Sequence, residues 1–324
     1  MNFFRNPPLA TVAINLVPRR GSWGGANQWT SQVTRYLENF GYRVRYDLKR
    51  SVDAIVMTHT GLSRGVSFDA GDVAGYLARE GQVPVIHRIN DNDIRKGTSE
   101  MDAYLAVSNE VASHTVFVSE WLRDHHAKKW FDATKPHSVI EAGADPAVFH
   151  PLGNCPPGSG DPLRIVTHHW SDNWSKGFDV YQEIDELIAS GAVKGFELWI
   201  IGRWPKELIW KSARTHAPAS GRELAALLRQ CHLYVSASRF EPGAMHPVEG
   251  LQCGLPLIAH PDSGGTLTMG QRYGVVLGDS LAATLAEVRE RYLPLRNTLL
   301  AEPPSGDLMG IAYRRLLQRL LATS

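Results

Sequence analysis

The sequence predicts an α/β protein built from two Rossmann-like domains that face each other across a cleft. β-like runs alternate with helical patterns in both halves, which is typical of parallel sheets covered by helices. A stretch dense in Gly and Pro separates the halves, and 324 residues suffice for about two domains. We expect one domain over residues 1–150, a linker over 151–162, a second domain over 163–305, and a final helical segment, 306–324, that packs back on the first domain.

In the first half, runs rich in β-branched and aromatic residues predict strands. These are Thr11–Leu16, Tyr42–Asp47, Ala54–Thr58, Val83–Ile89, Ala103–Val107, Thr115–Ser119 and Ser138–Ala142. Apolar residues at helical spacing predict helices near Ala26–Phe40, Ala70–Arg79 and Glu120–Lys129. Ser119 is expected to cap the last of these, because a serine hydroxyl accepts a hydrogen bond from the first turn.

The second half repeats the pattern after the linker. Its predicted strands are Arg164–His169, Leu198–Gly202, Leu233–Ser238, Leu255–His260 and Gly274–Leu277, with helices between them. The chain closes with an amphipathic helix over Leu308–Leu321.

Composition excludes several classes of protein. A net charge of +1 gives no electrostatic footprint for nucleic acid, so no nucleic-acid partner is expected. The longest apolar runs are too short to span a bilayer, which leaves at most peripheral membrane association, and the start has no apolar leader segment. Three scattered cysteines fit neither a disulfide framework nor a metal pattern. We expect a soluble, cytoplasmic protein.

Two carboxylates, Glu241 and Glu249, stand eight residues apart where a predicted strand gives way to a helix. Glu241 falls at the carboxyl end of the strand, and Glu249 on the first turns of the helix that begins near Met245. Gly243 and Ala244 would present free N–H groups at the helix N-terminus, where anions are favoured. The pattern suits a sugar joined to a phosphate; an ordinary strand–loop–helix unit with two surface glutamates is the alternative.

The surrounding residues resemble the donor-site signature of retaining glycosyltransferases of family 4. The matching segments are Glu241-Pro, Glu249-Gly-Leu-Gln-Cys-Gly-Leu-Pro-Leu-Ile-Ala259 and Asp262-Ser-Gly-Gly-Thr266. The family usually has Phe-Gly after Glu-Pro, whereas Gly243 comes one residue earlier here. The resemblance covers nearly the whole chain and implies the two-domain GT-B architecture, with a nucleotide-diphosphate sugar bound by the C-terminal domain.

The resemblance extends to the start of the second domain. Lys176, in Lys176-Gly-Phe-Asp179, matches the family lysine that neutralises the donor diphosphate, and at the start of a loop–helix element it is expected to contribute little to the core. Trp170 stands where the family usually has an arginine. The cation that replaces this arginine is left open among His168, His169, Arg203 and Arg239.

In the first domain, Gly24 and Gly25 precede a helix and would let a ligand approach the backbone closely. They are similar to the family's Gly-Gly turn, which faces the donor phosphate and the acceptor; an ordinary tight turn is the alternative. His87 is expected to end the strand run Pro84-Val-Ile-His87, and it matches a family histidine beside the donor sugar, with His59 as its competitor. The run Asp91–Asp93 would bind acceptor hydroxyls or form a solvated loop.

The resemblance therefore implies a retaining, metal-independent hexosyl- or pentosyltransferase that needs no cofactor. Glu249 would hold the ribose hydroxyls, while His87, Glu241 and Lys176 would serve the reacting centre. Further donor contacts are expected from Gly24, Gly25, Gly243, Ala244, Met245 and Arg203. No His, Asp or Glu cluster has metal-ligand spacing.

The acceptor is expected to be a saccharide or glycoconjugate, because several tryptophans could stack on sugar faces. These candidates are Trp23, Trp29, Trp170, Trp174 and Trp204. A sugar-nucleotide epimerase and a catalytically silent nucleotide-sugar-binding protein of the same fold stay open as alternatives. A glycoside hydrolase is less favoured, because the phosphate-binding features would then have no purpose.

Overall fold

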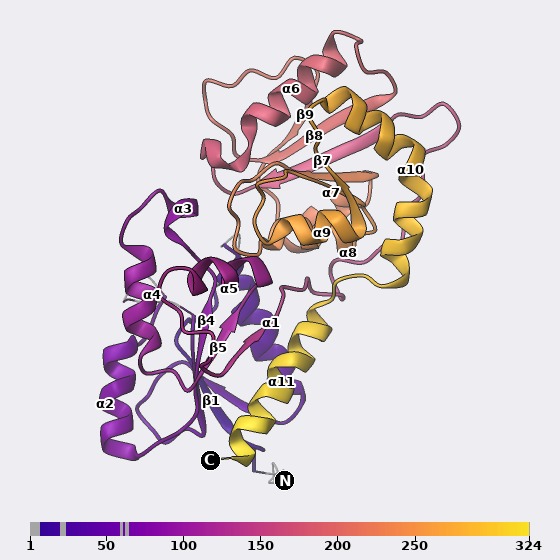
Figure 1. The fold of residues 1–324 in the computed structure, drawn as a ribbon. Helices are drawn as coiled ribbons and strands as arrows, with labels where there is room; N and C mark the ends of the chain where they lie inside the picture. The colour runs from indigo at the N-terminus through magenta and orange to yellow at the C-terminus, as the bar shows by residue number, and fades with distance from the viewer. Residues whose placement is uncertain (1–6, 20–23, 59–60, 62–64, 324) are drawn as a thin grey trace, which may run out of the picture. The chain divides into compact units, whose positions relative to one another are not determined.

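The computed structural model describes residues 7–19, 24–58, 61 and 65–323. The chain divides into two compact units: Met1–Glu141 with Asp307–Ser324, called here the N-terminal unit, and Ala142–Gly306, the C-terminal unit. Each unit holds a six-stranded sheet in which every strand pair is parallel (Figure 1). The predicted α/β class with two Rossmann-like domains is therefore confirmed.

The sheet of the N-terminal unit has the order β2-β1-β3-β4-β5-β6. Its strands are β1 (Thr11–Ile14), β2 (Arg43–Arg45), β3 (Ala54–Met57), β4 (Val85–Ile89), β5 (His114–Phe117) and β6 (His137–Val139). Its helices are α1 (Gly25–Asn39), α2 (Ala70–Glu80), α3 (Asp93–Lys96), α4 (Met101–Asn109), α5 (Glu120–Ala127) and α11 (Gly306–Ala322). The hydroxyl of Ser119 accepts the N–H of Leu122 (3.1 Å), so the predicted cap of α5 is confirmed.

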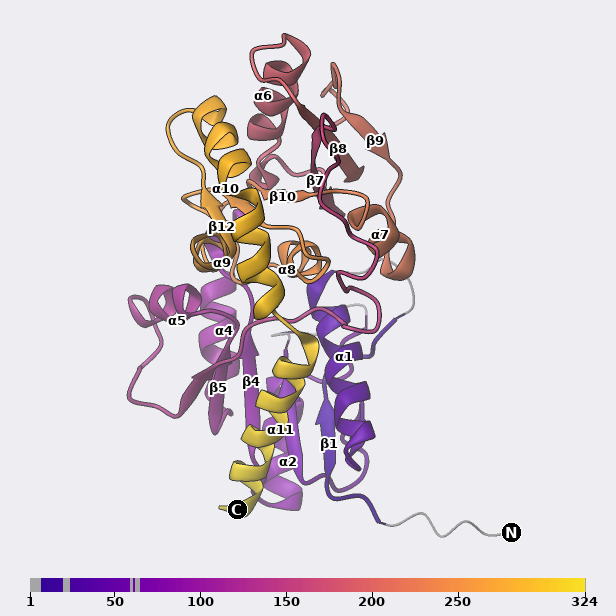
Figure 2. The ribbon, with the colours of Figure 1, turned by 90° about the vertical axis from the view of Figure 1, so that its right-hand side faces the viewer.

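Alternate residues of the N-terminal strands pack on opposite faces of the sheet, as the two-residue period of a strand requires. In β3, Val56 packs with α1 and α11, whereas Ile55 packs with α2. The helix α11 closes the first of these faces with Met309, Tyr313, Leu316 and Leu317. Figure 2 shows α11 running alongside α1 in this unit.

The sheet of the C-terminal unit has the order β12-β11-β10-β7-β8-β9. Its strands are β7 (Leu163–His169), β8 (Phe196–Gly202), β9 (Arg214–His216), β10 (Leu233–Ser236), β11 (Leu257–Ala259) and β12 (Gly274–Val276). Its helices are η1 (Trp174–Lys176), α6 (Phe178–Ala189), α7 (Gly221–Leu228), α8 (Met245–Gln252), α9 (Thr266–Tyr273) and α10 (Leu281–Ala301). One core joins the sheet to α7, α8 and α9, and the other joins it to α6 and α10.

The strand order fixes where a ligand can bind in the C-terminal unit. The chain runs outward from β7 through β8 to β9, then returns to β10 and runs the opposite way to β12. In open parallel sheets, ligands bind outside the carboxyl ends of the two strands at which this direction reverses. Those strands are β7 and β10.

The prediction of a strand over Ala103–Val107 is wrong, because these residues lie in α4. Leu105 is buried there, whereas Tyr104 and Val107 are exposed, so the short apolar run is not the interior of a sheet. Runs of this length do not distinguish a strand from a helix by periodicity alone. The edge strand β9 was not predicted, since Arg214–His216 carries no apolar alternation.

The structure also differs from the predicted domain boundary. Residues 142–162 belong to the C-terminal unit, and Phe149 packs in its core. Asn154, inside the predicted linker, donates from Nδ2 to the carbonyls of Arg229 and Cys231 (3.0 and 2.7 Å). The many Gly and Pro residues predict irregular backbone there, but an irregular segment can pack against a domain and need not be a linker. No helix of the described chain has the length and apolar character needed to cross a membrane.

Candidate active site

The carboxyl ends of β7 and β10 carry the polar residues that the sequence singled out in the C-terminal unit. The segment after β7 contains η1 and ends with Lys176, and the segment after β10 leads through Glu241 to α8. The two segments are joined by backbone: the N–H of Arg239 donates to the carbonyl of Ser175 (3.0 Å). The reversal point of the sheet therefore brings together residues that lie 65 positions apart.

Glu241 is buried, and its carboxylate accepts a hydrogen bond from the ammonium of Lys176. Its backbone is fixed as well, because its carbonyl accepts the N–H of Gly265 (2.8 Å). A Cβ on Gly264 would lie 2.5 Å from that carbonyl oxygen, so only glycine permits this approach. Phe240, just before Glu241, is the one described non-glycine residue in the left-handed region (φ 55°), and such strain is often found at functional sites.

The start of α8 presents backbone donors beside Glu241. The cap residue, Ala244, has no side chain able to accept a hydrogen bond from the first turn. Among the described residues, no acceptor is found for the N–H groups of Gly243, Ala244 and Met245. The N-terminus of a helix favours an anion, because its free N–H groups and its dipole both point outward.

Glu249 lies one helical turn further along α8 and is also buried. Its Oε2 accepts a hydrogen bond from His168 Nε2 at 2.8 Å, and both side chains are almost inaccessible to solvent. His168 Nδ1 is in turn 3.0 Å from the hydroxyl of Tyr234, which lies 3.0 Å from Nδ1 of His246. The carboxylate is therefore held by a chain of buried polar groups.

The structure distinguishes among the four candidates for the second cation. His168 is engaged with Glu249. Burial, aided by His246 and Lys176, holds the pKa of His169 well below its usual range, so this ring is neutral. The guanidinium of Arg239 forms two hydrogen bonds with the carboxylate of Asp179 (2.6 and 3.0 Å).

Arg203 is the remaining candidate, and it is exposed directly after β8. Its backbone N–H donates to the carbonyl of His169 (2.9 Å), which places it at the same edge of the sheet as the end of β7. Within the described chain its guanidinium forms no hydrogen bond or ion pair. Arg203 is thus the cation at this edge that is free to meet an anion.

In the N-terminal unit, Gly24 caps α1 and Gly25 is its first residue. A Cβ at Gly24 would meet no described atom within 4 Å, so the backbone there is open to a close approach. Residues 20–23, which include Trp23, and His59 lie outside the described residues. Trp29 is a core residue of this unit, 1% exposed, and therefore cannot stack on a sugar.

The prediction that His87 ends its strand is wrong. β4 continues through Arg88 to Ile89, so His87 lies in mid-strand, paired with Met57 and Thr115, and is fully buried. Its Nδ1 lies 3.1 Å from Oδ1 of Asn109 and donates to it. Burial lowers the pKa of His87 to about 4. The side chain is enclosed within the sheet, and its Nε2 forms no hydrogen bond with a described residue.

One cluster in the N-terminal unit has the composition of a metal site. Ligand atoms of Asp102, His125 and His126 lie within 4.8 Å of one another, which sequence spacing did not predict. The ammonium of Lys129 already pairs with Asp102 (2.5 Å), and the indole N–H of Trp130 donates to His126 Nδ1 (2.8 Å). Both contacts compete with a metal ion for these side chains.

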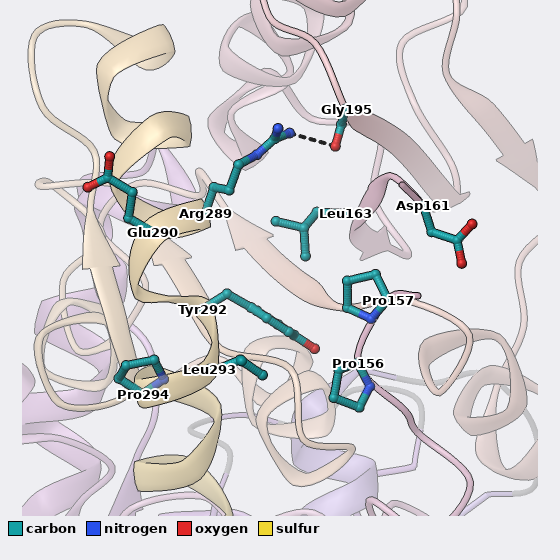
Figure 3. A pocket seen from close by; sticks show the side chains of 10 residues that line it. All are labelled: Pro156, Pro157, Asp161, Leu163, Gly195, Arg289, Glu290, Tyr292, Leu293 and Pro294. Carbon is teal, nitrogen blue, oxygen red and sulfur yellow. Dashed lines mark hydrogen bonds between the residues drawn. The ribbon is translucent and has the colours of Figure 1, made fainter. Parts of the chain in front are cut away.

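A cavity of about 400 Å³ in the C-terminal unit lies at the wrong end of the sheet for this chemistry. It is lined by Leu163, where β7 begins, and by Gly195, just before β8 (Figure 3). Arg289 points across it and donates to the carbonyl of Gly195 (2.6 Å). The guanidinium of Arg289 is therefore already hydrogen-bonded within the protein. The residues after β7 and β10 remain the candidate site.

Comparisons with known proteins identify the fold and a matching family model. Residues 204–293 match the family model described as Glycosyl transferases group 1. The fold is that of the GT-B glycosyltransferases. The matched region begins directly after Arg203 and contains Glu241, Glu249 and α8. No curated protein matches the chain by sequence.

Three solved structures show the same fold over nearly the whole chain. Sucrose-phosphate synthase from Thermosynechococcus elongatus has 16% identity and a TM-score of 0.66, with coverage of 97% of this chain and 100% of that one. Alr3699/HepE from Anabaena, in complex with UDP and glucose, has 13% identity and a TM-score of 0.67 (96% and 100%). The catalytic domain of starch synthase IV from Arabidopsis thaliana, bound to ADP and acarbose, has 12% and 0.70 (97% and 100%).

Buried His87 predicts a pH dependence of stability. Because its folded-state pKa, about 4, is below the ordinary value of 6.5, the unfolded chain binds the proton more readily, and stability falls as pH falls from about 6.5 toward 4. Between pH 7.5 and 5 this group should account for about 2 kcal/mol of lost unfolding free energy. His87→Gln should remove that part of the loss in urea titrations at the two pH values. An unchanged pH slope in the variant would contradict the assignment.

The Lys176–Glu241 pair corrects the expectation that Lys176 contributes little to the core. Lys176→Met leaves Glu241 buried without its cation, which should cost about 3 kcal/mol of unfolding free energy in urea denaturation. Adding Glu241→Gln should restore most of the loss, since the charge is then absent. Arg291→Met, which breaks the exposed Arg291–Glu287 pair, is the control and should change stability by less than about 0.5 kcal/mol. A loss in the control as large as that in Lys176→Met would contradict the account.

Proposed function

We propose that the chain is a retaining glycosyltransferase that moves a sugar from a nucleotide-diphosphate sugar to a hydroxyl acceptor. The observation that carries the proposal is the pair of buried carboxylates, Glu241 and Glu249, on either side of an uncapped helix N-terminus. Carboxylates accept the hydroxyl hydrogens of sugars, and the helix start attracts phosphate. The match of residues 204–293 to a glycosyltransferase model supports the same reading.

The donor is assigned to the edge of the C-terminal sheet by the chemistry of each group. Glu249 receives the ribose hydroxyls through Oε1, which accepts no hydrogen bond from a described residue. Arg203 and the N–H groups of Gly243 to Met245 receive the diphosphate. Glu241, already hydrogen-bonded to Lys176, receives hydroxyls of the transferred sugar. Two structures of the same fold were solved with UDP or ADP, which supports a nucleotide as part of the donor.

In the transfer, the bond between the anomeric carbon and the diphosphate oxygen breaks while the acceptor oxygen bonds to the same carbon. The acceptor's hydroxyl proton leaves with the diphosphate or passes to solvent. Negative charge grows on the leaving oxygen, and donors fixed in advance stabilise it without reorganising. Lys176, Arg203 and the start of α8 supply that stabilisation without a metal or cofactor. Retention is part of the proposal because of the family 4 resemblance.

A saccharide or glycoconjugate is proposed as the acceptor. Trp174 is 44% exposed on η1, next to Lys176, and its indole offers an apolar face to a sugar ring. Trp170 is partly exposed at the end of β7 and can act with it.

A nucleotide-sugar-binding protein without turnover is the second candidate function. Two observations favour it: Trp170 replaces the family arginine, and His87 is fully buried in mid-strand. Both functions require nucleotide binding, so turnover distinguishes them.

Turnover should appear when the protein is given UDP-, GDP- and ADP-sugars with oligosaccharide acceptors, measured as release of the nucleoside diphosphate. It should survive EDTA, because the positive charge that meets the leaving group comes from side chains and backbone dipoles. The anomeric configuration of the product, read by NMR, tests retention. Tight nucleotide binding with no release would establish the silent function, and loss of turnover on chelation, restored by manganese, would contradict the metal-independent mechanism.

Arg203→Ala should weaken binding of a nucleoside diphosphate by roughly tenfold or more, because a hydrogen bond to a charged group is lost. Binding of the nucleoside alone should be unaffected, since it has no phosphate. Arg239→Ala is the matched control: its guanidinium is engaged with Asp179, and calorimetry should show little change. The reverse order of effects would assign the diphosphate to Arg239 instead.

A further inference from the structure

A closed circuit of hydrogen bonds surrounds Glu249. It leaves α8 at Glu249, passes to His168 on β7 and to Tyr234 on β10, and returns to α8 at His246. The three links measure 2.8, 3.0 and 3.0 Å. Two neighbouring strands and one helix are thereby joined through side chains at the candidate donor site.

Two members of this circuit are too deeply buried to touch a substrate. His168 is 2% exposed and Tyr234 is fully buried. The helix lies so close that a Cβ on Gly250, the residue after Glu249, would be 2.3 Å from the Tyr234 ring. His168 and Tyr234 can therefore influence a ligand only through Glu249.

The hydroxyl of Tyr234, which carries one proton, lies within hydrogen-bond distance of both histidines. It can donate to one imidazole Nδ1 and must accept from the other, and it also accepts the backbone N–H of His168 (3.2 Å). An ionised Glu249 only accepts, so His168 Nε2 carries the proton of that hydrogen bond. The position of the His168 ring is thus set by both of its nitrogens, and with it the position of Oε2 of Glu249.

We propose that His168, Tyr234 and His246 form a positioning chain that holds the Glu249 carboxylate toward the ribose of the donor and so gives the site its preference for ribose over deoxyribose. This role rests on the proposed function. With Oε2 held by His168, Oε1 is oriented toward the ribose hydroxyls. Without the chain, Glu249 keeps its charge but loses its fixed orientation, and a hydrogen bond that depends on direction weakens.

The test compares ribose with deoxyribose. UDP, ADP and GDP are titrated into the full chain by calorimetry, and the one that binds is compared with its 2′-deoxy and 3′-deoxy forms. The wild type should favour the ribose form over at least one deoxy form by about tenfold or more. Glu249→Gln should bring that ratio close to one. Tyr234→Phe, which keeps the ring and removes only the hydroxyl, should lower the ratio at least about threefold, and His168→Leu should lower it further.

Tyr181→Phe is the matched control. Tyr181 is an equally buried tyrosine whose hydroxyl is hydrogen-bonded to His169 and to the N–H of Ala237 (both 2.9 Å), and it makes no direct hydrogen bond to Glu249. It can change stability or overall affinity, but the ribose ratio should stay at the wild-type value. A wild-type ratio in Tyr234→Phe, with Glu249→Gln lowered as expected, would overturn the positioning chain while leaving the proposed function intact. Failure of the wild type to bind any of the three diphosphates would overturn the proposed function, and this role with it.

Discussion

The geometry of the candidate site depends on the burial of two carboxylates beyond the carboxyl ends of β7 and β10. A buried carboxylate is costly unless it is paired and hydrogen-bonded, so each requires a partner within the fold. Lys176 supplies it for Glu241 and His168 for Glu249, and both partners come from the chain at or after β7. The two pairs hold the chain just before and just after the start of α8. The first N–H groups of this helix have no acceptors among the described residues. In the proposed function, stability and ligand recognition therefore use the same side chains.

Neighbouring groups at this edge differ in how available they are to a ligand. Arg239 is paired with Asp179, and His169 is neutral. Arg203, in contrast, is exposed and has no ion-pair partner within the described chain. The replacement of the family arginine by Trp170 then leaves the positive charge on β8 instead of β7. The diphosphate would be reached from the adjacent strand, which the backbone hydrogen bond from Arg203 to His169 brings alongside.

The sequence predicted the strands of both sheets except β9, because parallel strands are apolar on both faces. It also predicted the end of α8, because Gly254-Leu-Pro stops the helix. It did not predict the positions of His87 or of residues 103–107, because a polar residue can lie inside a strand and a short apolar run can be helical. The His168–Tyr234–His246 chain was also missed, since no local pattern links residues 66 and 12 positions apart. Only the strand order brings them together.

The most direct measurement of the central claim is amide hydrogen exchange with and without a nucleoside diphosphate. If the diphosphate binds at the start of α8, the amides of Gly243, Ala244 and Met245 should exchange more slowly in its presence, because their hydrogens then have an acceptor. Peptides covering residues 170–177 and 203–206 should be protected in parallel. Protection confined to residues 156–163 and 289–294, which line the cavity at the opposite edge of the sheet, would contradict the account.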